Sequence, residues 1–248
     1  ADTGAGRLPE PELLADLVWS TLAGSSARAD LVGRHVVVSA GGTREPIDPV
    51  RFIGNRSSGK QGYALARAAL ARGAEVTLVA ANTALADPAG VKVVHVVTAA
   101  ELQTAMQAAT ATSDVAVMAA AVADFRPAHA AGHKLKKGVD APDAIELTAN
   151  PDILTALVSA RRPEQLVVGF AAETHDVVGN GRDKLARKGT DVLVVNQVGE
   201  SLGFETDDNA ATILIAGGGQ VEVPRGSKDV LAHRVWDVVV AELARARA

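Results

Sequence analysis

The stretch FIGNRSSGKQG, residues 52 to 62, combines the small and cationic residues that a phosphate-binding loop requires. Gly54, Gly59 and Lys60 match the spacing of the P-loop pattern G-x-x-x-x-G-K-[ST], but Gln61 stands where that pattern needs a magnesium-binding hydroxyl. The insertion REPIDPVRFIGNRSS also separates the preceding apolar run, HVVVSA, from the next helix. A P-loop joins its strand to its helix without such an insertion, so the stretch is not a P-loop.

The same stretch still predicts an anion-binding site. Ser57 or Ser58 suits the N-cap of a helix that starts near residue 58, where free backbone N–H groups and the helix dipole favour anions. Gly59 would let a ligand approach the backbone closely. Four cations surround these residues: Arg44, Arg51, Arg56 and Lys60. A purely structural turn would need the glycine and the caps but not the cations, so the anion site is favoured.

A second cationic stretch, HKLKKG, places Lys134, Lys136 and Lys137 in a loop after the apolar run DVAVMAA. A charge run of this kind is usually a solvated surface. Its place after a strand, on the side of a parallel sheet where ligands bind, also fits mobile lysines that close over a polyphosphate. Both interpretations stay open from the residues alone.

Five further residues could serve a nucleotide site or have a structural role. In TANPDIL, Asn150 is expected to cap a helix that has Pro151 in its first position and Asp152 in its first turn, which explains these residues structurally. Asp124 could contact a sugar hydroxyl or a magnesium ion, or cap a turn. Phe170 ends the run QLVVGF and is a candidate platform for a base, although a core position is the commoner fate.

Two pairs with a spacing of four residues suggest shared ligands. Lys184 and Lys188 would lie on one helical face and could hold one anion together, or simply form a solvated face. His129 and His133 have the spacing of a metal pair, but Gly132 interrupts a helix and no third ligand is near. We therefore expect no zinc site there.

The elements that must position these residues alternate along the chain from Arg34. Short β-branched runs without polar alternation indicate strands buried on both faces, as in a mostly parallel sheet covered by helices. The run AATILIAGGGQVEVP predicts an antiparallel hairpin near the end. The expected fold is therefore an α/β, Rossmann-like, doubly wound, mostly parallel sheet with a C-terminal antiparallel hairpin. Helices are expected at 58–72, 99–110, 151–160, 177–188 and 227–247.

Composition narrows the class of protein. The 248 residues, 48% of them hydrophobic, are enough for one large α/β core. A net charge of −4 argues against nucleic acid as the default partner. The absence of cysteine excludes a disulfide, a Cys-ligated zinc and a thiol nucleophile. No apolar run reaches the roughly 20 residues that span a bilayer, so we expect a cytoplasmic protein that binds neither membrane nor nucleic acid.

A dehydrogenase-like cadence, SAGGT followed by GKQGYALARAALARGAEVTLVA, makes an NAD(P)-dependent Rossmann reductase the main alternative. Two residues count against it. Asn82 follows the second strand where a ribose-binding acid is expected. Tyr63 is the only tyrosine and lies inside the first helix of the sheet, so a catalytic Tyr–Lys pair at a later strand is not available.

Six motifs in order resemble the bacterial phosphopantothenate–cysteine ligases, also called phosphopantothenoylcysteine synthetases. They are SAGGTREPIDPVRFIGNRSSGKQG, AAAVADFRP, KLKK, NPDIL, VVGFAAET and GFETDDNA. The resemblance runs from about Arg34 to the end of the chain. The amphipathic segment PEPELLADLVWSTLAG and its surroundings, residues 1–30, resemble the tail of the flavin-dependent decarboxylase usually fused in front. We therefore expect a decarboxylase tail at 1–30 and a ligase domain at 31–248, in a chain cut from a longer one.

The resemblance implies an activity. The family activates the carboxylate of 4′-phosphopantothenate with CTP and Mg²⁺, which gives an acyl-cytidylate and pyrophosphate. The amine of cysteine then attacks the acyl carbon and releases CMP. The family is homodimeric, with higher assembly through the fused decarboxylase, and FMN belongs only to that missing domain.

The resemblance, with the anion loop, also assigns residues. Asn55 and Lys134 would be catalytic: Asn55 holds the acyl-cytidylate, and Lys134 belongs to a flap that closes over the site. Substrate contacts would come from Arg51, Asn55, Ala120 and Ala121, with Arg51 near the dimer interface. Asp124 is the candidate magnesium ligand. The expected nucleotide-binding residues are Ser57, Ser58, Gly59, Lys60, Met118, Ala119, Ala120, Asp124, Lys134, Pro151, Asp152, Ile153, Leu154, Phe170, Lys184 and Lys188.

Overall fold

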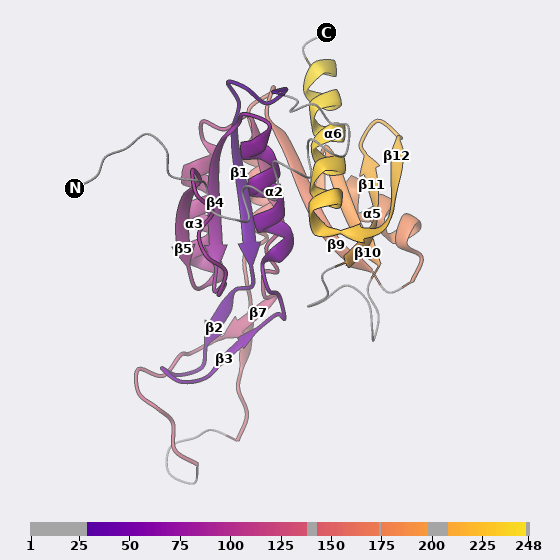
Figure 1. Ribbon diagram of the computed structural model, residues 1–248. Helices are drawn as coiled ribbons and strands as arrows, with labels where there is room; N and C mark the ends of the chain where they lie inside the picture. The colour runs from indigo at the N-terminus through magenta and orange to yellow at the C-terminus, as the bar shows by residue number, and fades with distance from the viewer. Residues whose placement is uncertain (1–28, 138–142, 174, 198–207, 247–248) are drawn as a thin grey trace, which may run out of the picture.

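The computed structural model describes residues 29–137, 143–173, 175–197 and 208–246, and the amphipathic segment PEPELLADLVWSTLAG lies outside them (Figure 1). Eight strands form one sheet in the order β12-β11-β10-β9-β6-β1-β4-β5. From the β5 edge inwards and across, they are β5 (Lys92–Val96), β4 (Glu75–Ala81), β1 (His35–Gly41), β6 (Val115–Met118), β9 (Leu166–Glu173), β10 (Val192–Gln197), β11 (Asp208–Ile215) and β12 (Gln220–Ser227).

The six strands from β5 to β10 are parallel, and β10, β11 and β12 pair antiparallel. The predicted doubly wound sheet with a C-terminal hairpin is therefore confirmed. The chain builds outwards from β1 to β5 and then returns to add β6 on the other side of β1. The strand order thus reverses between β1 and β6, and ligands of such sheets bind beyond the carboxyl ends of the strands at this point.

Helices cover both faces of the sheet because the strands carry apolar side chains on both. The helices α2 (Lys60–Ala71) and α6 (Lys228–Arg245) pack together over one face. Trp236 of α6 is fully buried there and its indole N–H donates to the carbonyl of Leu65 at 2.9 Å, as expected of a packing residue. The other face carries α3 (Ala99–Thr110), α4 (Ile153–Ala160) and α5 (Val177–Lys188).

Two short hairpins project beyond the carboxyl end of β1 and form what we call the arm (Figure 1). The first pairs β2 (Arg44–Pro46) with β3 (Phe52–Gly54), and the second pairs β7 (Phe125–Pro127) with β8 (Leu147–Ala149). The two hairpins contact each other through β7. None of these strands was predicted, because three residues are too few for an apolar periodicity to be visible.

Two predicted helix caps are wrong. The N-cap of α2 is Gly59 in the left-handed conformation, with φ of 79° and no side-chain cap, so neither Ser57 nor Ser58 caps this helix. The N-cap of α4 is Asp152, whose carboxylate accepts the backbone N–H of Thr155 at 3.1 Å. Asn150, the expected cap, lies two residues earlier and makes different contacts. No helix in the described part of the chain has the length and hydropathy to cross a membrane.

Candidate functional site

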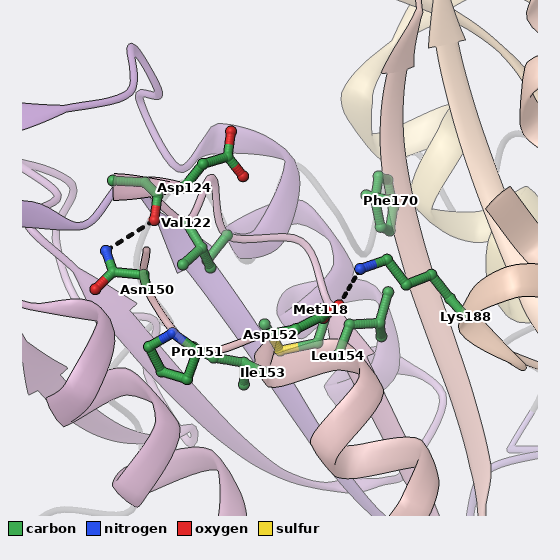
Figure 2. A pocket seen from close by; sticks show the side chains of 12 residues that line it. Met118, Val122, Asp124, Asn150, Pro151, Asp152, Ile153, Leu154, Phe170 and Lys188 are labelled. Carbon is green, nitrogen blue, oxygen red and sulfur yellow. Dashed lines mark hydrogen bonds and ion pairs between the residues drawn. The ribbon is translucent and has the colours of Figure 1, made fainter. Parts of the chain in front are cut away.

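A pocket of about 220 Å³ lies where β6 ends and β9 continues beside it (Figure 2). Its wall comes from four elements: the segment after β6, the start of α4, the middle of β9 and the end of α5. The lining residues are Met118, Ala120, Val122, Ala123, Asp124, Asn150, Pro151, Asp152, Ile153, Leu154, Phe170 and Lys188. Most of the predicted nucleotide residues from Met118 onwards therefore come together.

The backbone wall after β6 is held by two buried hydroxyls. The Oγ atom of Ser39 in β1 accepts the N–H groups of Ala119 and Ala120, both at 3.1 Å. The Oγ1 atom of Thr43 accepts the N–H of Ala123 at 3.0 Å. Neither Ser39 nor Thr43 was among the predicted site residues. The available signal was the hydroxyl of Ser39 directly after three valines, because a buried polar group needs a partner.

Asn150 closes another side of the pocket by bonding to that same segment. Its amide nitrogen donates to the carbonyl of Ala123 at 2.8 Å. Arg126 donates to the side-chain oxygen of Asn150 at 3.1 Å and to the carbonyl of Ala149 at 2.7 Å. Asn150 is therefore a wall residue that ties β8 to the loop after β6, and Arg126 fixes its amide orientation.

Asp152 and Lys188 form an ion pair within the pocket wall (Figure 2). The Asp152 carboxylate also accepts the hydroxyl of Thr155 at 2.8 Å. Burial alone would raise the pKa of Asp152, but the Lys188 ammonium and the Thr155 hydrogen bonds outweigh it, so the pKa lies below its ordinary value. The pocket thus contains a cation that an anionic ligand can reach, already paired with the N-cap of α4.

Phe170 both lines the pocket and packs against the larger hydrophobic core. The two interpretations of this residue are compatible, since a half-buried ring can present one part to a ligand. Of the predicted lysine pair, only Lys188 lines the pocket, whereas Lys184 of the same helix does not. A shared grip on one anion by Lys184 and Lys188 is not preformed.

The stretch FIGNRSSGKQG packs against the strand ends instead of lining this pocket: at Gly59, a Cβ atom would lie 2.6 Å from the side chain of Thr83 and 3.2 Å from the backbone nitrogen of Gly41, the last residue of β1. Gly41 has a φ of 85°, and a Cβ atom there would lie 1.9 Å from the carbonyl oxygen of Ala81. The predicted anion residues Ser57, Ser58, Gly59 and Lys60 are not among those that line the pocket. Asn55 connects the loop to it, because its amide nitrogen donates to the carbonyl of Val122 at 2.8 Å. Val122 itself is a lining residue.

Ala119 and Ala121 contribute through their backbone only. Ala121 bonds to the turn at the end of β1, residues 41–43: its N–H donates to the carbonyl of Gly41 at 2.8 Å, and its carbonyl accepts the N–H of Thr43 at 3.1 Å. Ala119 receives the Ser39 contact described above. Neither residue lines the pocket. Both set the path of the wall that carries Met118 and Ala120.

Arg51 and Lys134 lie in the arm and not in the pocket wall. The Arg51 guanidinium donates from Nε and Nη2 to the Asp48 carboxylate at 3.0 and 2.6 Å, and from Nη2 to the carbonyl of Leu135 at 3.2 Å. The Lys134 side chain is exposed. The expected site is therefore divided between the pocket and the arm.

Asp124 lines the pocket with an exposed side chain. Among the residues that the structure describes, no group of three or more His, Cys, Asp or Glu side chains could hold a metal by itself. A single carboxylate fits Mg²⁺ only where a ligand's phosphates complete the coordination, which is the usual arrangement for this ion.

The two residues that bear on a reductase have structural roles. Asn82, at φ of 51°, uses its amide nitrogen to donate to the carbonyls of Gly42 and Val97 at 2.9 and 2.8 Å. Tyr63 is 1% exposed, and its hydroxyl bonds to that of Thr83 at 2.8 Å. Neither side chain is placed to contact a cofactor.

Comparison with known proteins identifies relatives along nearly the whole chain. The profile of the DNA/pantothenate metabolism flavoprotein C-terminal domain family matches residues 31–243. The chain is 54% identical over 255 residues to the coenzyme A biosynthesis bifunctional protein CoaBC of Mycobacterium tuberculosis strain H37Rv, covering 98% of this chain and 61% of that protein. The corresponding protein of Bacillus subtilis strain 168 is 43% identical over 240 residues, covering 96% and 58%.

The fold has a solved counterpart. A crystal structure of the C-terminal domain of CoaBC superposes with a TM-score of 0.75 at 35% identity, covering 88% of this chain and 99% of that chain. The chain spans about three fifths of the length of the curated relatives. The similarity therefore concerns one part of a longer bifunctional protein.

Proposed function

The chain belongs to the DNA/pantothenate metabolism flavoprotein C-terminal domain family, and from this premise we propose that it is the phosphopantothenate–cysteine ligase of coenzyme A biosynthesis. In the first half-reaction, a carboxylate oxygen of 4′-phosphopantothenate attacks the α-phosphorus of CTP. The bond to the β-phosphate bridge breaks, which gives the acyl-cytidylate and pyrophosphate. In the second, the amine of cysteine attacks the acyl carbon, loses a proton and expels CMP.

The observation that carries the proposal is the composition of the pocket beside α4. A helix N-terminus supplies N–H groups, Lys188 supplies a cation and Phe170 supplies an apolar surface, all gathered where β6 ends beside β9, next to the switch point between β1 and β6. These features match the parts of a nucleotide: the N–H groups and the cation suit its phosphates, and the apolar ring suits its base. Transfer of a nucleotidyl group depends chiefly on such positioning and charge neutralisation.

We place Mg²⁺ with the triphosphate, at Asp124. Its exposed carboxylate lines the pocket and is the one acidic side chain there besides the paired Asp152. When bound, Mg²⁺ would neutralise phosphate charge. The chain's own residues orient the nucleotide: Lys188 faces the anion, and the wall held by Ser39 fixes the backbone at Ala119 and Ala120.

Asn55 is placed for the second half-reaction. Its amide is uncharged, so it adds little to binding a triphosphate, but it can donate to an acyl carbonyl oxygen on which negative charge develops. Its contact with Val122 holds it at the rim of the pocket. Lys134 and Arg51 act from the arm. Lys134 closes over the nucleotide, and Arg51 contacts the substrate.

We infer a homodimer that forms through the arm. Five large apolar side chains are exposed there, on or next to both hairpins: Val50 (59%), Phe52 (51%), Phe125 (54%), Ile145 (43%) and Leu147 (51%). Exposed apolar residues gathered on one projection are typical of an interface and not of a free surface. A second copy of the same arm would cover them and bring Arg51 near the partner's site.

A nucleotide screen tests the activity. The chain is incubated with phosphopantothenate and Mg²⁺ and with CTP, ATP, GTP or UTP in turn, and pyrophosphate is measured before and after cysteine is added. We expect pyrophosphate with CTP only, and CMP only once cysteine is present. Nucleotide binding without pyrophosphate under every combination, or turnover of a nicotinamide cofactor, would overturn the assignment.

Sedimentation of the wild type and of Phe125→Ser tests the dimer, which the variant should weaken.

A further inference from the structure

A buried carboxylate in the arm connects two segments that are far apart in the sequence. Asp48 lies between β2 and β3, and its side chain has no exposed surface. Its Oδ1 atom accepts the N–H groups of Val50 and Arg51, both at 2.8 Å. Its Oδ2 atom accepts Nε and Nη2 of Arg51 and, at 3.2 Å, the backbone N–H of Leu135. Asp48 therefore joins the first hairpin to the segment that carries the lysines.

Both backbone polar groups of Leu135 are hydrogen-bonded to the first hairpin. Its N–H donates to Asp48, and its carbonyl accepts Nη2 of Arg51 at 3.2 Å. A further backbone bond, from the N–H of Ala131 to the carbonyl of Ile47 at 2.9 Å, runs between the same two segments. The backbone on the C-terminal side of Lys134 is thus fixed, whereas the Lys134 side chain is exposed.

A local turn explains only part of this arrangement. An aspartate that accepts the N–H groups two and three residues ahead is a common turn feature, and Val50 and Arg51 satisfy it with one oxygen. The second oxygen reaches 87 residues along the chain to Leu135. Burying an ionised group is unfavourable unless it is paired and hydrogen-bonded, and here the ion pair with Arg51 and five hydrogen bonds supply that compensation.

The carboxylate is ionised over the whole neutral range. Arg51 holds the pKa of Asp48 well below its ordinary value, and the backbone N–H groups of Val50, Arg51 and Leu135 act in the same direction against the effect of burial. A charged acceptor makes stronger hydrogen bonds than a neutral one. The contact to Leu135 therefore keeps a charged acceptor at neutral pH.

We propose that Asp48 is a positioning residue that fixes the backbone at Leu135 and so sets where the ammonium of Lys134 can reach. The part of this inference that concerns catalysis rests on the proposed ligase function. The anchoring of Leu135 does not, and it is measured without any nucleotide. The geometry also accounts for Arg51 lying outside the pocket, because its guanidinium is used in the same anchor.

The variant Asp48→Asn tests the anchor with almost no change of size. An amide in this place has one oxygen and no charge, so it cannot accept all the bonds that the carboxylate accepts. The matched control is Asp229→Asn, which removes the same charge from an ion pair with Arg67, between α6 and α2. Amide hydrogen exchange at Leu135 should become about tenfold faster in Asp48→Asn and stay unchanged in the control, as expected for loss of a charge-assisted bond.

Activity measurements then separate positioning from general stability. Asp48→Asn should lower kcat for pyrophosphate formation about tenfold with little change in KM for CTP, because ground-state binding in the pocket is intact. In a Lys134→Gln background the same substitution should have less than about a twofold effect, since both changes disable one unit. Lys137→Gln should leave the effect of Asp48→Asn unchanged.

Each result decides the proposal. Unchanged exchange at Leu135, or an equal loss of kcat in the wild-type and Lys134→Gln backgrounds, overturns it. If Asp48→Asn does not fold, Leu135→Pro replaces it in the activity measurements only, because proline lacks the anchored N–H, and with it any amide exchange at this position, while Asp48 and Arg51 remain. A wild type that releases no pyrophosphate overturns the proposed function instead, and the anchor is then judged by exchange at Leu135 alone.

Discussion

Lys188, the last residue of α5, is ion-paired with Asp152, the N-cap of α4, and both side chains line the pocket (Figure 2). The pair joins two helices that precede adjacent parallel strands, β9 and β10. Because Lys188 is already neutralised by Asp152, a phosphate that binds here must compete with a carboxylate. The ion pair therefore sets the affinity of the pocket for anions as well as the spacing of its wall.

Removing the cation should weaken nucleotide binding. We expect Lys188→Gln to raise the Kd for CTP about tenfold, the size of one partly exposed charge interaction, with a shallower dependence on salt. Lys184→Gln, on the same helix but outside the pocket wall, should change the Kd less than about twofold. Calorimetric titration with CTP in the absence of phosphopantothenate measures both. Equal losses would mean that both lysines contact the nucleotide once it binds.

The same pair predicts a pH dependence of stability. The pKa of Asp152 is lowered in the folded protein, so the unfolded chain binds the proton more readily as the pH falls. The stabilisation is fully present above the unfolded pKa, about 4, and is lost as the pH falls through the lower folded value. The difference in unfolding free energy between wild type and Asp152→Asn should therefore be constant from about pH 5 to 8 and shrink below about pH 4. Urea unfolding at several pH values measures it. A difference that grows on acidification would contradict this account.

The parallel sheet was predictable because its strands are buried on both faces and so lack the alternation of polar and apolar residues. The runs HVVVSA, EVTLVAA and QLVVGFA all form central strands. The helix starts were less predictable, since several residues can cap a helix in each case. Asp152 takes the place expected of Asn150, and Gly59 that of Ser57 or Ser58, because the turn before α2 requires a left-handed residue.

The pocket was predictable as far as it follows from the order of strands in the sheet. Met118 ends β6, Phe170 lies within the neighbouring strand β9, and α4 begins beside them. Whether Arg51 and Lys134 reach the pocket depends on how the arm folds back. The sequence does not predict this, because strands as short as those of the two hairpins show no periodicity. Ser39 was missed for another reason: its role is to accept two N–H groups from the segment after β6, which only the tertiary structure brings within reach.

Ser39→Ala should weaken the wall of the pocket. The substitution leaves the N–H groups of the half-buried residues Ala119 and Ala120 without the buried Oγ acceptor, and the low end of the about 1–3 kcal/mol typical of a buried unsatisfied group applies. We expect a loss of unfolding free energy of that size and a higher KM for CTP. Ser159→Ala is the control, because its exposed hydroxyl donates only to a carbonyl of its own helix. A normal KM in a destabilised Ser39→Ala would confine this serine to a structural role.

Gly41→Ala should be among the most damaging single substitutions of the turn at the end of β1, residues 41–43. Its φ of 85° disfavours any side chain, and a Cβ atom would lie 1.9 Å from the carbonyl of Ala81, which is backbone and cannot rotate away. Strain and overpacking together suggest a loss of more than about 2 kcal/mol. At Gly217 a Cβ atom would meet nothing within 4 Å, so Gly217→Ala should be neutral within about 0.5 kcal/mol. Thermal unfolding compares the two.

The most specific prediction about the mechanism concerns Asn55. Its backbone does not occupy the left-handed region, so asparagine is not needed there to relieve strain. Its amide nitrogen donates one N–H to the carbonyl of Val122, and an amide carries a second N–H. We propose that this second N–H donates to the acyl carbonyl oxygen, where negative charge develops as cysteine attacks. The second half-reaction should therefore depend on Asn55 more than the first.

Asn55→Asp separates this role from that of shaping the loop. The carboxylate cannot donate, and it places a negative charge beside the developing oxyanion, so CMP release should slow by about 10²-fold or more. Pyrophosphate formation should fall much less, and the acyl-cytidylate should accumulate and be trapped by rapid quenching in a single turnover. If Asn55 serves only to hold Val122, Asn55→Asp will slow both half-reactions equally through the damaged wall, and Asn55→Gly will do the same. A variant that loses pyrophosphate and CMP in parallel would thus reject the proposed role, whereas a trapped intermediate in Asn55→Asp would support it directly.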